Sequence, residues 1–411
     1  MSRPLSILLF STLYPNAMQP QHGLFVEQRL RHLLDHGEAV ARVVAPVPWF
    51  PWTHSGFGRY ARLAGVPEQE WRHGIEILHP RYPVIPRIGM TLAPLLMAAA
   101  LLPLLRRLAE APNPAGGRGF DLIDAHYFYP DGVAAAWLGR RLGKPVVITA
   151  RGTDINLIPR HRLPRHMIRW AARQAAGVAA VSQALKQGLV EIGVPPERVT
   201  VLRNGVDPQL FHPVDPGEAR RRLDLDGPGP VLAAVGHLTA RKGYDRLIRA
   251  LPLLPPETRV VIAGGWDVPG EENPLPGLHG LARSLGVEER VRFLGSWPQD
   301  ELKYLYSAAD VLVLASSREG WANCLLESMA CGTPAAVSPV WGNPEVVAAP
   351  EAGRVMADQS PEAIAETVRA LLREPPPREA VRRYAERFDW QAVSQGQMAL
   401  FRQAMQEGRR P

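Results

Sequence analysis

Two carboxylates stand eight positions apart in the segment SREGWANCLLESMACGTPAAVSPVWGNPE, residues 317–345. An α-helix turns about 100° per residue, so a continuous helix would leave Glu319 and Glu327 roughly 80° apart. The two carboxylates therefore converge only if Glu319 lies in a loop before a helix that contains Glu327. Gly320 permits such a turn, and Asn323 is expected to cap the helix.

The start of this helix is expected to complete the site. Backbone N–H groups at a helix N-terminus bind anions, and Trp321, Ala322, Asn323, Cys324 and Leu325 supply them directly after Gly320. A phosphate at the helix start with a carboxylate on either side suits a phosphorylated sugar. The alternative interpretation is a capped helix with two surface glutamates, and spacing alone does not separate the two.

The complete phrase, from Glu319 through MACGTP to GNPEVV, resembles the signature of glycosyltransferase family 4. The resemblance implies an α/β protein of GT-B architecture, with two Rossmann-like domains facing across a cleft. It also implies retaining transfer of a hexose from a nucleotide diphosphate sugar. By the same resemblance, Glu319 contacts the donor sugar and Glu327 contacts the ribose of the nucleotide.

Two cations follow the first strand of the second half, in AAVGHLTARKGYDRLIRAL. Loops at the carboxyl ends of parallel strands bind ligands, so Arg241 and Lys242 are placed to neutralise a diphosphate leaving group. Many family members have Gly-Arg where this chain has Gly236-His237, and we expect Arg241 to replace that arginine. The alternative is ordinary surface charge.

The first half contributes residues for the sugar and the acceptor. The resemblance implies that His126, at a strand end in DLIDAHYFYPDG, reaches the transferred sugar, although a lone histidine there is often structural. Many relatives have His-Gly where this chain has Arg151-Gly152, and we expect Arg151 and Asp154 to contact acceptor hydroxyls or phosphate. Gly23 begins a helix and permits close approach of the donor or the acceptor. These loops resemble enzymes of teichuronic-acid-type and other cell-surface polysaccharide synthesis.

No motif for a bound cofactor or metal is present. The chain has neither a P-loop nor a GxGxxG after its first strand, and Asp224-Leu-Asp226 falls in a turn-rich linker. We therefore expect a metal-independent enzyme with the nucleotide sugar as co-substrate. Cys324 and Cys331 lie on one expected helix and cannot bridge each other, which indicates a reducing compartment.

Charge is uneven along the 411 residues. Residues 1–205 carry 24 Lys and Arg against 13 Asp and Glu, a balance of +11, and the remainder carries 23 against 27. An anionic partner such as a membrane surface or a polyphosphate-linked acceptor fits the basic half, and no nucleic-acid-binding motif is present. Arginine-rich solvated surface is the alternative. The N-terminus lacks a signal-peptide pattern, so a cytoplasmic protein is expected, with peripheral attachment to the inner face of the membrane left open.

One stretch without charge, residues 88–105, reaches the lower length for crossing a bilayer. Pro94 and Pro103 interrupt it. A helix buried against the sheet is the favoured interpretation, with insertion into a membrane surface and a true span as alternatives. The basic segment at 159–173 is compatible with contact to anionic lipid.

Apolar runs alternate with amphipathic stretches, which is typical of parallel sheets covered by helices. Strands are expected at 5–12, 41–45, 75–78, 122–125, 146–149, 178–181, 199–203, 231–235, 259–263, 291–294, 311–314 and 335–337. Helices are expected at 24–35, 91–108, 133–142, 165–175 and 183–192, with a linker from 204 to 230. The expected domains are an acceptor-side domain at 1–205, a nucleotide-sugar-binding domain at 206–388, and a C-terminal helix at 389–411 that crosses back to the first.

The resemblance thus implies a retaining hexosyltransferase that acts on a glycan or lipid-linked acceptor hydroxyl in cell-surface polysaccharide synthesis. Two other classes remain open. One is a non-catalytic sugar-binding or scaffold protein on the same fold, and the other is a nucleotide-sugar epimerase or hydrolase.

Overall fold

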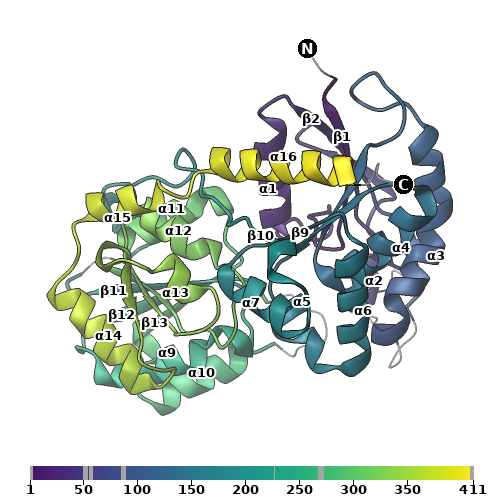
Figure 1. The fold of residues 1–411 in the computed structure, drawn as a ribbon. Helices are drawn as coiled ribbons and strands as arrows, with labels where there is room; N and C mark the ends of the chain where they lie inside the picture. The colour runs from purple at the N-terminus through teal and green to yellow at the C-terminus, as the bar shows by residue number, and fades with distance from the viewer. Residues whose placement is uncertain are drawn as a thin grey trace. The chain divides into compact units, whose positions relative to one another are not determined.

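The chain forms two compact units (Figure 1). A computed structural model describes residues 3–49, 54, 59–84, 89–225, 227–266 and 273–407. Unit 1 comprises Met1–Arg203 together with Gln391–Pro411, and unit 2 comprises Asn204–Trp390. Each unit has a parallel sheet covered by helices, which confirms the predicted α/β class.

The main sheet of unit 1 has the strand order β10-β9-β8-β7-β1-β2-β5-β4. All neighbours are parallel except β4 and β5, which pair antiparallel at one edge. A separate parallel pair joins β3 and β6. The strands are β1 (Leu5–Phe10), β2 (Ala39–Val44), β3 (Val47–Pro48), β4 (Gln69–Arg72), β5 (Ile75–Leu78), β6 (Arg81–Tyr82), β7 (Leu122–His126), β8 (Val146–Ala150), β9 (Gly177–Ala180) and β10 (Val199–Val201).

Helices cover both faces of this sheet. The buried side chains Ile7 and Leu9 of β1 and Val147 of β8 pack with helices α1 and α16 in one apolar cluster. Helix α4 packs on the other face, where Gly139 lies against the neighbouring strand residue Val146. The helices are α1 (Leu24–Leu34), α2 (Arg59–Ala64), α3 (Gly89–Glu110), α4 (Val133–Leu142), α5 (Thr153–Asn156), α6 (Arg162–Gln174), α7 (Gln183–Glu191) and α16 (Trp390–Glu407).

Helix α3 contains most of the uncharged stretch, of which residue 88 lies outside the described residues. Its length and composition would suit a membrane span. Of its most apolar 18-residue stretch, 33% is buried inside the protein. The helix packs mainly against α4, with further contacts to β6 of the two-stranded sheet. The expected burial against the main sheet was therefore wrong, because α4 covers this side of the helix. One side of α3 is therefore buried and the other faces solvent.

Unit 2 has a wholly parallel sheet in the order β13-β12-β11-β14-β15-β16. Its strands are β11 (Val231–Val235), β12 (Arg259–Ala263), β13 (Val291–Gly295), β14 (Val311–Leu314), β15 (Ala335–Val337) and β16 (Gly353–Val355). Its helices are α8 (Pro216–Arg222), α9 (Tyr244–Ala250), α10 (Leu275–Ser284), α11 (Leu302–Ala308), α12 (Asn323–Ala330), α13 (Asn343–Val346), α14 (Pro361–Arg373) and α15 (Arg378–Ala385).

Helix α8 lies in the segment that the sequence favoured as a linker. The Asp215 side chain caps it by accepting from the N–H of Glu218, and Pro216 occupies the first helical position. Arg220 donates to the carbonyl of Ala308 and pairs with Asp310. These bonds attach the segment to α11 and β14, so it is part of unit 2.

The C-terminal helix supplies a testable part of the unit 1 core. Phe401 is fully buried in the cluster with β1 and α1. Phe401→Ala should lower the free energy of unfolding of unit 1 by about 3–5 kcal/mol, because it leaves a cavity. Chemical denaturation followed by circular dichroism measures the change. Gln403→Ala, an exposed position on the same helix, should stay within about 0.5 kcal/mol of wild type. A loss of stability in Phe401→Ala no larger than in Gln403→Ala would show that α16 is not part of the core.

Candidate active site

His126 and Arg151 meet at the ends of two neighbouring strands of unit 1. His126 ends β7 and Arg151 follows β8, which runs parallel beside it. The His126 Nε2 lies 3.0 Å from Asp124 Oδ2, and the Arg151 Nε lies 3.1 Å from His126 Nδ1. A guanidinium only donates hydrogen bonds, so the Nδ1 of His126 is the acceptor. The ring proton is therefore on Nε2, which donates a hydrogen bond to Asp124.

The His126 ring is therefore neutral and enclosed. Burial lowers the pKa of His126, Asp124 opposes this shift only in part, and Arg151 adds to it, so that the pKa is about 4. The ring is 1% exposed, and both nitrogens are bonded within the protein. Direct contact between His126 and the transferred sugar was expected, but this geometry favours a supporting role in which His126 holds Arg151.

A second tier of buried polar groups supports Asp124. Gln397 Nε2 on α16 donates to Asp124 Oδ2 at 3.0 Å, and Arg29 Nε on α1 donates to Gln397 Oε1 at 2.7 Å. Burial lowers the pKa of Arg29 to about 10, against the opposing field of Asp124. Sequence reasoning missed Arg29 and Gln397. The available signal was an arginine between Val26 and Leu30 on the apolar stripe of α1, where a buried charge requires a partner.

Asp154 has a different task from the one expected. It is fully buried, and its carboxylate accepts hydrogen bonds from the backbone N–H groups of Phe128 at 2.8 Å and Gly152 at 2.7 Å. Burial raises its pKa and these bonds oppose the rise. The carboxylate thus fastens the turn after β8 to the segment after β7. This geometry does not support the predicted acceptor contact of Asp154, whereas Arg151 keeps 8% of its surface exposed.

The start of α1 lies beside Arg151. Gly23 adopts φ 70°, and a Cβ there would stand 2.4 Å from the carbonyl oxygen of Leu13. Only glycine fits this position, which presses the helix start against the loop after β1. The guanidinium of Arg151 stacks over the ring of Phe25, the second residue of α1, at 5.4 Å. The glycine thus brings the helix start to the side of the cation; its predicted donor contact remains a prediction.

Tyr127, directly after β7, is a residue that sequence reasoning missed. It has φ 85°, which is rare for a bulky side chain, and its hydroxyl is hydrogen-bonded to the hydroxyl of Thr153. Strained backbone of this kind concentrates at functional sites. The half-buried Tyr127 is therefore a further candidate at the same strand ends.

In unit 2 the two predicted cations converge on the first glutamate. A single turn of 3-10 helix, Ala240–Lys242, follows β11. Lys242 Nζ lies 2.8 Å and Arg241 NH1 2.9 Å from the same oxygen of Glu319. Burial alone would raise the pKa of Glu319, but the two cations outweigh it and bring the pKa to about 2. The cluster is thus ionised and carries a net charge of +1.

Glycines admit the lysine to this cluster. Gly236, at the end of β11, has φ 141°, and a Cβ there would lie 2.8 Å from Lys242 Cε. A Cβ on Gly264 would lie 1.8 Å from the carbonyl oxygen of Gly236. The neighbouring His237 is exposed. Arg241 joins Lys242 at Glu319, as expected for a replacement of the family arginine.

Glu319 lies in the loop before α12, as the sequence predicted. The helix cap differs: Ala322 is the N-cap and Asn323 is the first helical residue. The Asn323 side chain instead accepts from Asn204 Nδ2 at 3.0 Å. The Leu325 N–H already donates to the carbonyl of Ala322, so it does not contribute to the predicted anion site. The predicted anion site is therefore limited to the backbone N–H groups of residues 321–324.

Two side chains of the same helix complete the description. Cys324 is half-buried and burial raises the pKa of its thiol to about 12, so it stays protonated. Glu327 is 9% exposed and accepts a hydrogen bond from the Tyr306 hydroxyl at 2.8 Å. Burial raises the pKa of Glu327 to about 7, against the opposing effects of Tyr306 and Lys242. Lys242 thus lowers the pKa of both glutamates, most directly that of Glu319, to which it is hydrogen-bonded.

Tyr306 was also missed by sequence reasoning. It lies on the buried stripe of α11, where a hydroxyl needs a partner, and that pattern was the available signal.

The described residues contain no group of three or more side chains that could hold a metal ion. Asp224 is exposed and pairs with Arg292 at 3.5 Å, and Asp226 lies outside the described residues. Residues 267–272 also lie outside the described residues.

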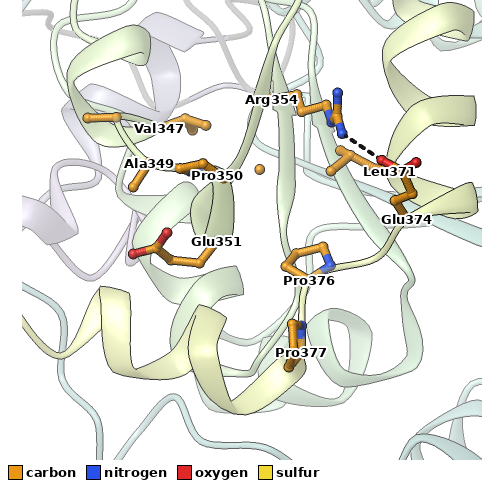
Figure 2. A pocket seen from close by; sticks show the side chains of 11 residues that line it. Val347, Ala349, Pro350, Glu351, Arg354, Leu371, Glu374, Pro376 and Pro377 are labelled. Atoms are coloured by element: carbon orange, nitrogen blue, oxygen red, sulfur yellow. Dashed lines mark hydrogen bonds and ion pairs between the residues drawn. The ribbon is translucent and has the colours of Figure 1, made fainter.

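A cavity of about 720 Å³ occurs elsewhere in unit 2, beside the edge strand β16. Figure 2 shows the ion pair of Arg354 with Glu374 above Pro376 and Pro377. None of the predicted site residues lines this cavity.

The two glutamates should affect stability in opposite directions. Glu327 binds its proton more tightly in the folded state, so its contribution is complete below pH about 4.5 and is lost as pH rises toward 7. Glu319 binds its proton less tightly, so its contribution is present above pH about 4.5 and is lost as pH falls toward 2. Glu327→Gln should therefore flatten the fall in stability between pH 4.5 and 7, by up to about 3 kcal/mol.

Denaturant titrations from pH 4.5 to 7.5 measure this effect, with Glu319→Gln as the matched variant. Glu319→Gln should destabilise the protein at pH 7, because it leaves Lys242 and Arg241 uncompensated. The same pH dependence in Glu327→Gln as in wild type would contradict the assigned protonation.

Comparison with known proteins identifies the family. Residues 216–388 match the family described as Glycosyl transferases group 1, and residues 60–210 match Glycosyltransferase Family 4. The chain is 33% identical over 318 residues to the D-inositol 3-phosphate glycosyltransferase of Frankia alni, covering 72% of this chain and 77% of the relative. It is 30% identical over 314 residues to the protein of the same description in Mycolicibacterium paratuberculosis, covering 73% and 70%.

Solved structures show the same fold. Sucrose-phosphate synthase from Thermosynechococcus elongatus has a TM-score of 0.77 at 20% identity, covering 98% of this chain and 99% of that one. HepE of Anabaena in complex with UDP has a TM-score of 0.71 at 22% identity, covering 96% and 98%. The chain is therefore a glycosyltransferase of family 4, the group 1 glycosyltransferases, and has their GT-B fold.

Proposed function

We propose that this enzyme transfers a hexose from a nucleotide diphosphate sugar to an acceptor hydroxyl, with retention of configuration and without a metal ion. The observation that carries the proposal is the convergence of Lys242 and Arg241 on Glu319 at the end of β11. Two cations beside one carboxylate leave positive charge for a diphosphate. Because the pKa of Glu319 is about 2, its carboxylate remains ionised and can accept hydrogen bonds from sugar hydroxyls.

The proposed reaction breaks the bond between the sugar C1 and the β-phosphate oxygen and forms a bond between C1 and the acceptor oxygen. The acceptor proton passes to the departing phosphate, because attack occurs on the side of the leaving group. Lys242, Arg241 and the first N–H groups of α12 stabilise the negative charge that develops there. Glu327, held by Tyr306, accepts hydrogen bonds from the ribose.

Unit 1 is proposed to bind the acceptor. Arg151, held between His126 and the ring of Phe25, presents a fixed guanidinium suited to an anionic group. His126 then acts through Arg151 as a positioning residue. Tyr127 lies at the same strand ends and is proposed to contact the acceptor.

Two acceptor classes are compatible with an anionic contact. The loop resemblance favours a lipid-linked or glycan acceptor in cell-surface polysaccharide synthesis, at the cytoplasmic side of the membrane. The relatives at 30–33% identity are described as D-inositol 3-phosphate glycosyltransferases, which favours a small polyol phosphate. An assay with one donor and both acceptors separates the classes.

Nucleotide binding tests the donor site directly. One of UDP, GDP and ADP should raise the melting temperature by several degrees at about a hundred times its dissociation constant, with the same shift in EDTA. Lys242→Gln should weaken this nucleotide about 10- to 100-fold, because charge-assisted hydrogen bonds contribute about 1.5–3 kcal/mol. Titration calorimetry measures the affinity, and Lys186→Gln on α7 is the charge-matched control.

Glu327→Gln should weaken the same nucleotide, and an unchanged affinity would remove the ribose role. If no nucleotide binds, the donor site is degenerate and the scaffold alternative gains. Acceptor-independent release of sugar to water, or epimerised donor, would favour the hydrolase or epimerase. A product whose new anomeric bond has the opposite configuration to the donor would contradict retention.

A further inference from the structure

Helices α3, α4 and α6 form one layer on unit 1, in which α4 packs against both of the others (Figure 1). We call their solvent-facing side the α3–α6 face. The three helices carry eight arginines against one carboxylate, that of Glu110. This concentration of positive charge on one layer exceeds the general excess of the N-terminal half.

Helix α3 divides lengthwise into two stripes. Met97, Leu101 and Leu105 are fully buried against the protein. The opposite stripe exposes Leu95, at 44% of its surface, and Ala99 with Pro103 on the following turns. An apolar stripe of three turns therefore faces solvent on a folded unit.

Charge continues this exposed stripe toward the end of the helix. Arg106 and Arg107 are exposed on the turn after Pro103. An apolar stripe that ends in arginines is the pattern of a helix lying in a lipid interface, where the apolar side enters the acyl boundary and the cations meet the headgroups.

The neighbouring helices extend the same surface. On α6, Leu163 exposes 49% of its surface between the exposed Arg162 and Arg165. On α4, the exposed Arg141 stacks over the half-buried Trp137 at 4.4 Å. Apolar and cationic side chains thus occur together on α4 and α6, as they do on α3.

We propose that the α3–α6 face docks on an anionic lipid bilayer, with α3 lying along the surface. The arginines complement the negative headgroups, and the exposed leucines bury apolar area in the interface. A nucleic acid would use the cations but gains nothing from Leu95, Ala99 and Leu163. A bilayer-spanning arrangement would expose the buried stripe of α3 and dismantle its packing on α4.

Only the biological benefit of this docking rests on the proposed function. A glycosyltransferase with a lipid-linked acceptor would gain from residence on the membrane that holds the acceptor. The surface itself consists of residues other than the donor and acceptor residues proposed above. Binding to vesicles can therefore fail while nucleotide binding succeeds, and the reverse.

Vesicle flotation of the full-length protein tests the proposal. The protein should float with vesicles of phosphatidylcholine mixed with phosphatidylglycerol at about 0.1 M salt, and much less at about 1 M, where screening shortens to about 3 Å. Arg106→Glu with Arg107→Glu should reduce binding at least about 30-fold, since each arginine near an anionic surface contributes about fivefold. Leu95→Asp should also reduce it, because it removes apolar insertion.

The control is Arg31→Glu with Arg249→Glu, an equal charge change at exposed positions on α1 and α9. This variant should bind vesicles as wild type does, and all variants should keep the wild-type melting temperature and nucleotide shift. Equal binding to pure phosphatidylcholine, equal loss in the control, or unchanged binding after Leu95→Asp would each overturn the proposal. Retention on RNA without flotation on vesicles would assign the face to a polyanion instead.

Discussion

A charge that leaves water must meet a partner, and both candidate sites are organised around that constraint. In unit 2 the constraint acts on Glu319, which stays ionised while almost enclosed because two cations lie within 2.9 Å. The glycines at 236 and 264 are consequences of this arrangement, since a side chain at either would displace the lysine or the strand end. The loop after β11 and the ion pairs of Lys242 and Arg241 with Glu319 therefore depend on each other.

Unit 1 meets the same constraint in another way. Asp124 is shared between Gln397 and His126, while Arg29 and Arg151 stand at the two ends of this chain of hydrogen bonds. Two arginines and two carboxylates, Asp124 and Asp154, balance each other around a neutral imidazole. The unit 2 cluster retains net positive charge, whereas this cluster is compensated internally. This difference fits the diphosphate site that we propose for unit 2 and the rigid support that unit 1 gives to the guanidinium of Arg151.

Local patterns predicted much of this molecule. Strands β5, β11, β12, β14 and β15 and helix α4 begin and end at the expected residues, because each is a short apolar run or stripe with clear boundaries. The position of Glu319 ahead of α12 followed from helix geometry alone. The segment around α8 was misjudged because its glycines and prolines resemble a linker, while its helix depends on bonds to α11 and β14.

The remaining differences arise from contacts between distant residues. Arg29 and Gln397 are 368 positions apart, and no local pattern predicts that pair. Asn323 would cap an isolated helix, but Asn204 engages its side chain and Ala322 becomes the cap. Asp154 was expected to contact acceptor hydroxyls or phosphate, and only the fold brings the N–H groups of Phe128 and Gly152 to its carboxylate.

The return of α16 to unit 1 has a consequence for synthesis of the chain. The unit 1 core includes Met398, Phe401 and Ala404, so it lacks part of its apolar cluster until α16 has left the ribosome. Unit 2 is complete in sequence by Trp390. At roughly 5–20 residues per second, the partial core waits about 10–40 s for its final helix. The first unit to begin folding is thus the last to finish, and during that interval its exposed apolar sheet face is a target for chaperones.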